Sequence, residues 1–181
     1  MDCSKFAGLQ NSLGYHFTNA ELLKVALTHR SHNAQHNERL EFLGDSVLNC
    51  AVSILLYERH SNMDEGKLSR VRSHLVKQDC LAVVGRELSL DKYLYLGAGE
   101  LRGGSTIKDS IVADALEALF GAILLDSSFE EACGCVIRLL DPVLQLRWLD
   151  SALQSTWCVS QPNSPNWLNS LFGQTTPCRQ L

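Results

Sequence analysis

Carboxylate side chains recur at helical spacing near residue 40. Glu38, Glu41 and Asp45 stand at positions i, i+3 and i+7. At about 100° per residue of an α-helix, the three fall within roughly 60° of one another. Like charges held this close repel one another unless a cation lies between them. The pattern indicates either a solvated acidic face, the more common case for one isolated helix, or part of a cation site.

A second acidic pair, Asp114 and Glu117 at i, i+3, favours the cation site. The pair shares a helical face with Ser110 and Gly121, whose small size lets another helix or a phosphate approach closely. Two such helices side by side would offer the hard oxygen ligands that Mg²⁺ and Mn²⁺ prefer. These cations suit phosphodiester hydrolysis, because they polarise a phosphoryl oxygen and make a bound water acidic.

Apolar residues opposite the acids predict the helices that position them. Behind the first acidic face lie Leu40, Leu43, Val47, Ala51 and Ile54, and behind the second lie Val112, Leu116, Leu119 and Ile123. We expect helices over about 37–60 and 107–125, the first of them the central buried helix.

Other segments complete a domain with no sustained apolar/polar alternation, which predicts an all-α fold. Further helices are expected over 5–13, after a cap at Thr18 or Asn19, after a cap at Asn62 or Asp64 with a break near Gln78, and from Asp126 or Ser128 to about Trp148. The glycine-rich stretch 93–105 is expected to be a loop.

Composition limits the function classes. The 181 residues carry a net charge of −4, so bulk charge does not favour a basic nucleic-acid binder, although cations and local Lys or Arg can offset it. Seven cysteines without a C-x-x-C pair fit reduced thiols in a cytoplasmic protein, and Cys133 and Cys135 are expected to pack in the last helix. His32 and His36 lack the glutamate of a zinc motif, and no membrane partner is expected.

The stretch from Glu38 to Ser46, ERLEFLGDS, resembles the signature of the ribonuclease III family, bacterial type. The blocks Leu27–Ser31, Asp64–Gly66, Leu96–Glu100 and Asp109–Ala118 follow the order and spacing of that family. The resemblance covers about residues 5–145 and implies the helical fold of the ribonuclease III endonuclease domain.

The resemblance also implies an activity and a set of site residues. The activity is a Mg²⁺-dependent endoribonuclease, with Mn²⁺ as a substitute, that cuts both strands of double-stranded RNA to 5′-phosphate and 3′-hydroxyl ends. The implied RNAs are ribosomal precursors and structured messengers. The implied metal ligands are Glu41, Asp45, Asp114 and Glu117, of which Asp45 and Glu117 are the catalytic residues. Glu38, Glu65 and Lys108 match positions that bind substrate or support the site.

Phe42 lies beside the acids on the helical wheel and away from the apolar face. An exposed phenyl ring at such a place indicates a partner. The resemblance implies a homodimer in which this ring enters a socket on the second subunit. Two sites related by a two-fold axis would then each cut one strand of an A-form duplex. In a monomer the ring would cover a local gap instead.

The chain departs from the family near its end. We expect a catalytic domain over 1–149 and an irregular tail over 150–181, whose charged residues are Asp150 and Arg179. Bacterial members usually continue into a double-stranded-RNA-binding domain, which is not expected here, so electrostatic affinity for RNA should be lower. A stand-alone catalytic domain and a truncated product both remain open, and the alternative function is a non-cleaving dimeric RNA-binding module.

Overall fold

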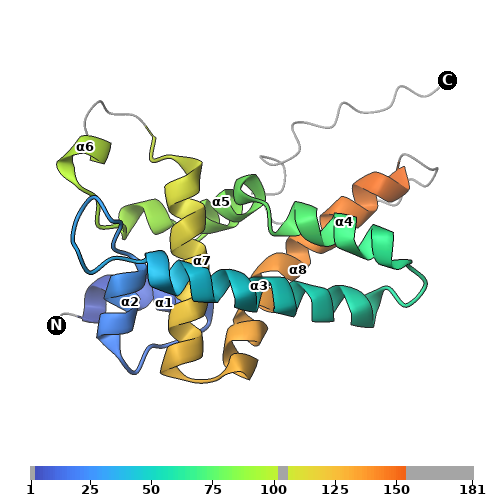
Figure 1. The fold of residues 1–181 in the computed structure, drawn as a ribbon, viewed down its shortest axis with the longest axis horizontal. Helices are drawn as coiled ribbons and strands as arrows, with labels where there is room; N and C mark the ends of the chain where they lie inside the picture. The colour runs from blue at the N-terminus through green and yellow to red at the C-terminus, as the bar shows by residue number, and fades with distance from the viewer. Residues whose placement is uncertain (1–2, 102–105, 154–181) are drawn as a thin grey trace. The chain divides into compact units, whose positions relative to one another are not determined.

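The computed structural model describes residues 3–101 and 106–153, and every regular element in this part of the chain is helical (Figure 1). The elements are η1 (Cys3–Phe6), α1 (Ala7–Leu13), α2 (Ala20–Ala26), α3 (Glu38–Arg59), α4 (Glu65–Leu75), α5 (Gln78–Glu87), η2 (Leu90–Lys92), α6 (Ala98–Leu101), α7 (Asp109–Asp126) and α8 (Phe129–Leu153). The all-α prediction is confirmed.

Predicted caps begin two of the helices, and a glycine ends a third. The side chain of Asn19 accepts a hydrogen bond from the Glu21 N–H at 3.0 Å at the start of α2. At the start of α4, Asp64 Oδ1 accepts from the Lys67 N–H at 2.9 Å. Gly14 ends α1 with a φ of +66°, a conformation that glycine adopts without strain. Local sequence therefore sets these boundaries.

Two elements differ from the sequence prediction. The expected glycine-rich loop contains a short helix, α6, and α8 continues to Leu153, beyond the predicted end near residue 148. The tail predicted from residue 150 therefore begins with four helical residues, and its remainder, 154–181, lies outside the described residues. Because α8 passes residue 150, the predicted boundary does not coincide with the end of a helix.

The central buried helix is α7 and not α3, contrary to the sequence prediction. Eleven of the 18 residues of α7 are buried, against eight of the 22 in α3. The predicted apolar stripe of α3 is also wrong at Ile54, which is 39% exposed. Periodicity indicates which residues share a face, but the neighbouring elements decide which of those residues are covered. Cys133 and Cys135 are buried in α8, as predicted.

By length and composition alone, α3 is apolar enough to cross a membrane, with a mean hydropathy of 1.4 over its best window. The core helix of a globular protein passes the same test. The eight buried residues of α3 and its contact with α7 account for this apolar character as core packing.

Helices α3 and α7 cross where each carries a glycine (Figure 1). A methyl group added at Gly44 of α3 would overlap the carbonyl oxygen of Glu117. One added at Gly121 of α7 would overlap the carbonyl oxygen of Leu40. The two backbones therefore touch directly. The contact falls beside Glu41 and Asp45 on α3 and beside Glu117 on α7, as the small size of Gly121 predicted.

A hydrogen-bonded frame holds the chain that leads into α3. Thr28 and Tyr95 form an isolated parallel bridge, in which the His29 N–H donates to the Tyr95 carbonyl at 3.0 Å. The Asn37 N–H donates to the Thr28 carbonyl at 2.9 Å, and the Asn37 carbonyl accepts from the Glu41 N–H at 2.9 Å. The first turn of α3 is thus joined to two segments that are distant in sequence.

Candidate active site

The carboxylates of α3 and α7 lie close enough to affect one another. Burial, followed by the negative charges of Asp45, Glu41 and Asp114 in that order, raises the pKa of Glu117 to about 8. Burial also raises the pKa of Glu41, with added repulsion led by Asp114. The four acids predicted to hold a metal therefore form one electrostatic cluster, built from both sides of the glycine crossing.

A cleft of about 540 Å³ adjoins the cluster. Glu38, Glu41 and Asp114 line this cleft, and so does Lys108 at the start of α7. Asp45 and Glu117 are not among its lining residues, although both act electrostatically on Glu41 or are acted on by it. The structure thus groups all four predicted acids and opens the space beside two of them to a ligand.

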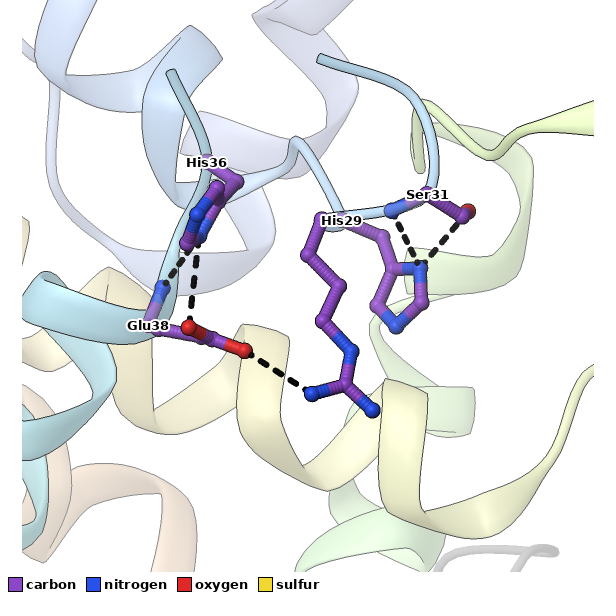
Figure 2. A network of polar contacts seen from close by, with 5 residues as sticks. His29, Ser31, His36 and Glu38 are labelled. Atoms are coloured by element: carbon purple, nitrogen blue, oxygen red, sulfur yellow. Dashed lines mark hydrogen bonds and ion pairs between the residues drawn. The ribbon is translucent and has the colours of Figure 1, made fainter. Parts of the chain in front are cut away.

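Basic side chains lie against the outer carboxylates of the cleft. Arg30 Nη1 lies 3.2 Å from Glu38 Oε1, and His36 Nδ1 lies 3.8 Å from Glu38 Oε2. Figure 2 shows Glu38 beside His36, with His29 turned toward Ser31. On the far side, Lys108 Nζ lies 3.1 Å from Glu100 Oε2. Glu38 and Lys108, predicted at the edge of the site, are thus both found there with ion-pair partners.

Several residues of the cleft were not predicted as site residues. They include His29, Arg30, Ser31, Asn37 and Glu100. Four of them belong to the blocks Leu27–Ser31 and Leu96–Glu100. The resemblance of these blocks to the family was the only feature of the sequence that could have indicated a role for these residues in the site. Neither block has helical periodicity, so the sequence alone does not show that tertiary contacts bring them to the acids.

Glu65 lies elsewhere in this chain. It begins α4, where Ser69 Oγ donates to its carboxylate at 2.7 Å. It lines a second cleft, of about 530 Å³, between α4 and the second half of α3, together with Ile54 and Tyr57. The substrate or support role inferred for Glu65 from the resemblance therefore stays a prediction.

The acid cluster fits a hydrated hard cation better than a tightly enclosed one. Carboxylate oxygens are suitable donors. Burial, together with neighbouring negative charge that a cation would offset, raises the pKa values of Glu41 and Glu117. In residues 3–101 and 106–153, no three His, Cys, Asp or Glu side chains form a ready ligand cage. Mg²⁺ commonly keeps several waters and uses one or two carboxylates with a substrate phosphate, so it does not need such a cage.

The raised pKa of Glu117 predicts a pH-dependent stability. Its carboxyl binds a proton more tightly in the folded chain (pKa about 8) than in the unfolded one (4.5). Stability from this group is therefore present below about pH 4.5 and is lost as pH rises to about 8. In EDTA, the difference in melting temperature between Glu117→Gln and the unmodified chain should grow over this range, in favour of the variant.

The same measurement with Glu131→Gln, an exposed acid in the first turn of α8, provides the control. A saturating divalent cation should reduce the difference for Glu117→Gln, because it offsets the repulsion. A difference that stays constant from pH 5 to 8.5 would contradict the electrostatic account of the cluster.

Comparison with known proteins identifies the family of this chain. A family model described as Ribonuclease-III-like matches residues 19–143. The chain is similar to ribonuclease 3 of Bordetella petrii, at 55% identity over 138 residues, which cover 76% of this chain and 55% of that protein. It is 56% identical over 137 residues to ribonuclease 3 of Cupriavidus taiwanensis, covering 76% and 54%.

A solved structure of the nuclease domain of ribonuclease III from Campylobacter jejuni is similar to this chain, with a TM-score of 0.72 and 39% identity. The match covers 75% of this chain and 96% of that one. The all-helical fold and the signature of this chain are thus those of a class of nuclease domains. The chain belongs to the ribonuclease-III-like family. It spans about half the length of the curated relatives it matches.

Proposed function

We propose that this chain is a divalent-cation-dependent endoribonuclease domain that hydrolyses both strands of double-stranded RNA, leaving 5′-phosphate and 3′-hydroxyl ends. The observation that supports this most is the cluster of four carboxylates on two crossing helices beside an open cleft. The family relationship supports the same substrate class. Ribosomal precursors and structured messengers are the proposed natural RNAs, and the cytoplasm is the proposed location.

In this proposal the role of each residue follows from its position in the cluster or at the edge of the cleft. Glu41, Asp45, Asp114 and Glu117 would hold Mg²⁺ or Mn²⁺, directly or through water. When bound, the cation supplies polarisation of a phosphoryl oxygen and a water acidic enough to react near neutral pH. Lys108 and Arg30, at the edges of the cleft, offer positive charge to neighbouring phosphates when their ion pairs with Glu100 and Glu38 open.

A cleavage assay tests the proposal. The purified chain is incubated with a long RNA duplex at low salt, where phosphate contacts are strongest, in either Mg²⁺ or EDTA. We expect cleavage only with Mg²⁺, on both strands, with 5′-phosphate ends detected by labelling after dephosphorylation. Retention of duplex RNA without any cleavage would instead support the non-cleaving binding module.

We also propose that the chain acts as a homodimer. Phe42 is 79% exposed, and Tyr57, at i+15 on the same helix, is 77% exposed. Between them on this face lie the small polar residues Ser46, Asn49 and Ser53. A helix face with small residues in its middle and aromatic rings at its ends favours close packing of a second copy. The similar Campylobacter jejuni structure is described as having structural flexibility in a region involved in dimer formation.

Substitution of Phe42 should weaken this dimer. Truncating an aromatic residue that anchors an interface typically costs about 2 kcal/mol or more, so the dissociation constant of Phe42→Ala should rise about 30-fold or more. Sedimentation equilibrium would then show the 20.1 kDa monomer at concentrations where the unmodified chain has twice that mass. Phe129→Ala, which removes a 38% exposed ring at the start of α8, is the matched control. Equal masses for both variants would contradict a role for Phe42.

A further inference from the structure

One edge of the His29 ring is held by Ser31 (Figure 2). The Ser31 N–H donates to His29 Nδ1 at 3.2 Å, and Ser31 Oγ lies 2.8 Å from the same nitrogen. A backbone N–H can only donate, so Nδ1 is an acceptor in this arrangement. The proton of the neutral ring therefore lies on Nε2, and Nε2 also carries a proton in the charged ring. His29 thus presents Nε2 as a hydrogen-bond donor.

A second segment of the chain supports the contact between Ser31 and His29. The Gly97 N–H donates to Ser31 Oγ at 2.9 Å, which leaves the hydroxyl proton of Ser31 available for Nδ1. A methyl group added at Gly97 would overlap the backbone carbonyl oxygen of Ser31, so the two segments pack directly together. The His29 N–H donates in turn to the Tyr95 carbonyl at 3.0 Å. The ring is therefore held both through its backbone and at its Nδ1 edge.

The Nε2 edge of the ring is open to a ligand. In the described part of the chain, Ser31 makes all the hydrogen bonds to the ring, and no carboxylate oxygen lies within 4.0 Å of a ring nitrogen of His29. His29 is only half-buried, and Nε2 is not among the side-chain nitrogens that are buried without a partner. Nε2 therefore has surface that a ligand can reach.

His29 lines the cleft next to the acid cluster. Burial raises the pKa of Asp114, and His29 is the first of the groups that lower it, ahead of Arg30. This effect indicates that the ring of His29 lies near the carboxylate of Asp114, although no hydrogen bond joins them. The free donor is therefore beside the acids and at the cleft.

The other donors of the cleft indicate what His29 binds. Arg30 and Lys108 also line the cleft, and both side chains can only donate. In the proposed function the neighbouring carboxylates are taken by a cation. A phosphodiester has only acceptor oxygens and a negative charge, so it complements these donors and is attracted by that cation.

We propose that His29 Nε2 donates a hydrogen bond to a non-bridging oxygen of an RNA phosphate in the cleft. The inference rests on the proposed function for the duplex substrate. In this arrangement His29 contacts the substrate and not the cation, because its Nε2 carries a proton and cannot act as a metal ligand.

Phosphate ethylation tests this contact on the full chain. An end-labelled RNA duplex, sparsely ethylated on its phosphates, is cut in Mg²⁺ under single-turnover conditions. Ethylation removes the charge and blocks one oxygen, so ethylated phosphates that accumulate in the uncut fraction mark the contacts. In His29→Ala, one marked phosphate on each strand should no longer accumulate, while the other contacts remain. The cleavage rate of the unethylated duplex should fall about ten-fold, as expected for one hydrogen bond to a charged group.

Three variants serve as controls. His16→Ala, at an exposed histidine that does not line the cleft, should keep every marked phosphate. The side-chain amide of His29→Gln can reach the place of Nε2 and should also keep them. The shorter side chain of His29→Asn cannot, so this variant should lose the same phosphate as His29→Ala. The glutamine and asparagine pair decides the question if the alanine variant does not fold.

The outcomes separate the two proposals. If the unmodified chain cuts duplex RNA but His29→Ala and His29→Asn keep every marked phosphate, the role of His29 is overturned and the proposed function stands. A folded His29→Ala without measurable cleavage would also overturn it, because one hydrogen bond to a phosphate does not account for such a loss. If the unmodified chain does not cut duplex RNA, the proposed function fails and this inference fails with it.

Discussion

Glu117→Gln should slow RNA cleavage by about 10²–10³-fold while leaving the fold intact. Glu117 is the acid on which the three other clustered carboxylates all act, and it is the one most affected by burial. The amide keeps the shape of the side chain but cannot carry the negative charge that a cation site needs. Removing one preorganised electrostatic contact of this kind lowers kcat by about 10²–10³-fold. Single-turnover cleavage of a labelled duplex in Mg²⁺ measures the loss.

Glu131→Gln makes the same chemical change at an exposed acid of α8 and should cleave at the unmodified rate. Glu117→Gln should also melt at a higher temperature than the unmodified chain at pH 8 in EDTA, because the variant lacks the half-buried charge of Glu117 and its repulsion by the neighbouring acids. An active Glu117→Gln with unchanged kcat would remove the acid cluster from the proposed mechanism.

Gly44→Ala and Gly121→Ala should each disrupt both the fold and the site. In either variant the new methyl overlaps a backbone carbonyl of the opposite helix. A side chain could change rotamer to relieve such an overlap, but a backbone carbonyl cannot. Overpacking a core typically costs about 1–3 kcal/mol, and a backbone clash should lie at or above the top of that range. Protein that still folds must separate α3 from α7, which moves Glu117 relative to Glu41. A displacement of about 1 Å can cost roughly 10²-fold in rate.

Gly134→Ala is the matched control for these two variants. An added methyl at Gly134 meets nothing within 4 Å, and the residue lies inside α8. Alanine is the better helix former, so this variant should gain about 0.5–1 kcal/mol of stability. Thermal unfolding and the cleavage assay distinguish the three proteins. Normal melting and activity of Gly44→Ala and Gly121→Ala would show that the helices do not depend on this close contact.

Local chemistry made much of the fold predictable. Helix caps were expected at Thr18 or Asn19 and at Asn62 or Asp64, because short polar side chains can accept from the first turn. Asn19 and Asp64 are the residues that do so. The acidic and apolar faces of α3 and α7 follow from a period that the backbone imposes on any sequence. Even the close approach at Gly121 follows from the missing side chain.

The predictions that depend on neighbours were less complete. Ile54 has the spacing of a core residue but is exposed, whereas the two residues after it, Leu55 and Leu56, are buried, so the covered face of α3 leaves Ile54 at its edge. Asn37 stands among polar residues in sequence, and its burial arises from a hydrogen bond to Thr28, nine residues earlier. Glu65 shares the acidic character of Glu38, yet it lines a different cleft. No local pattern carries such information.

The frame that joins Leu27 to His29, Asn37 and Tyr95 has a consequence for local unfolding. Three amide protons lie in it, those of His29, Asn37 and Tyr95, which bond to the carbonyls of Tyr95, Thr28 and Leu27. Because the release of one segment of this frame breaks the hydrogen bonds of the other segments, the three amides should exchange with deuterium through one shared opening event. Similar protection factors for all three by NMR would identify that event, and it would expose the floor of the cleft.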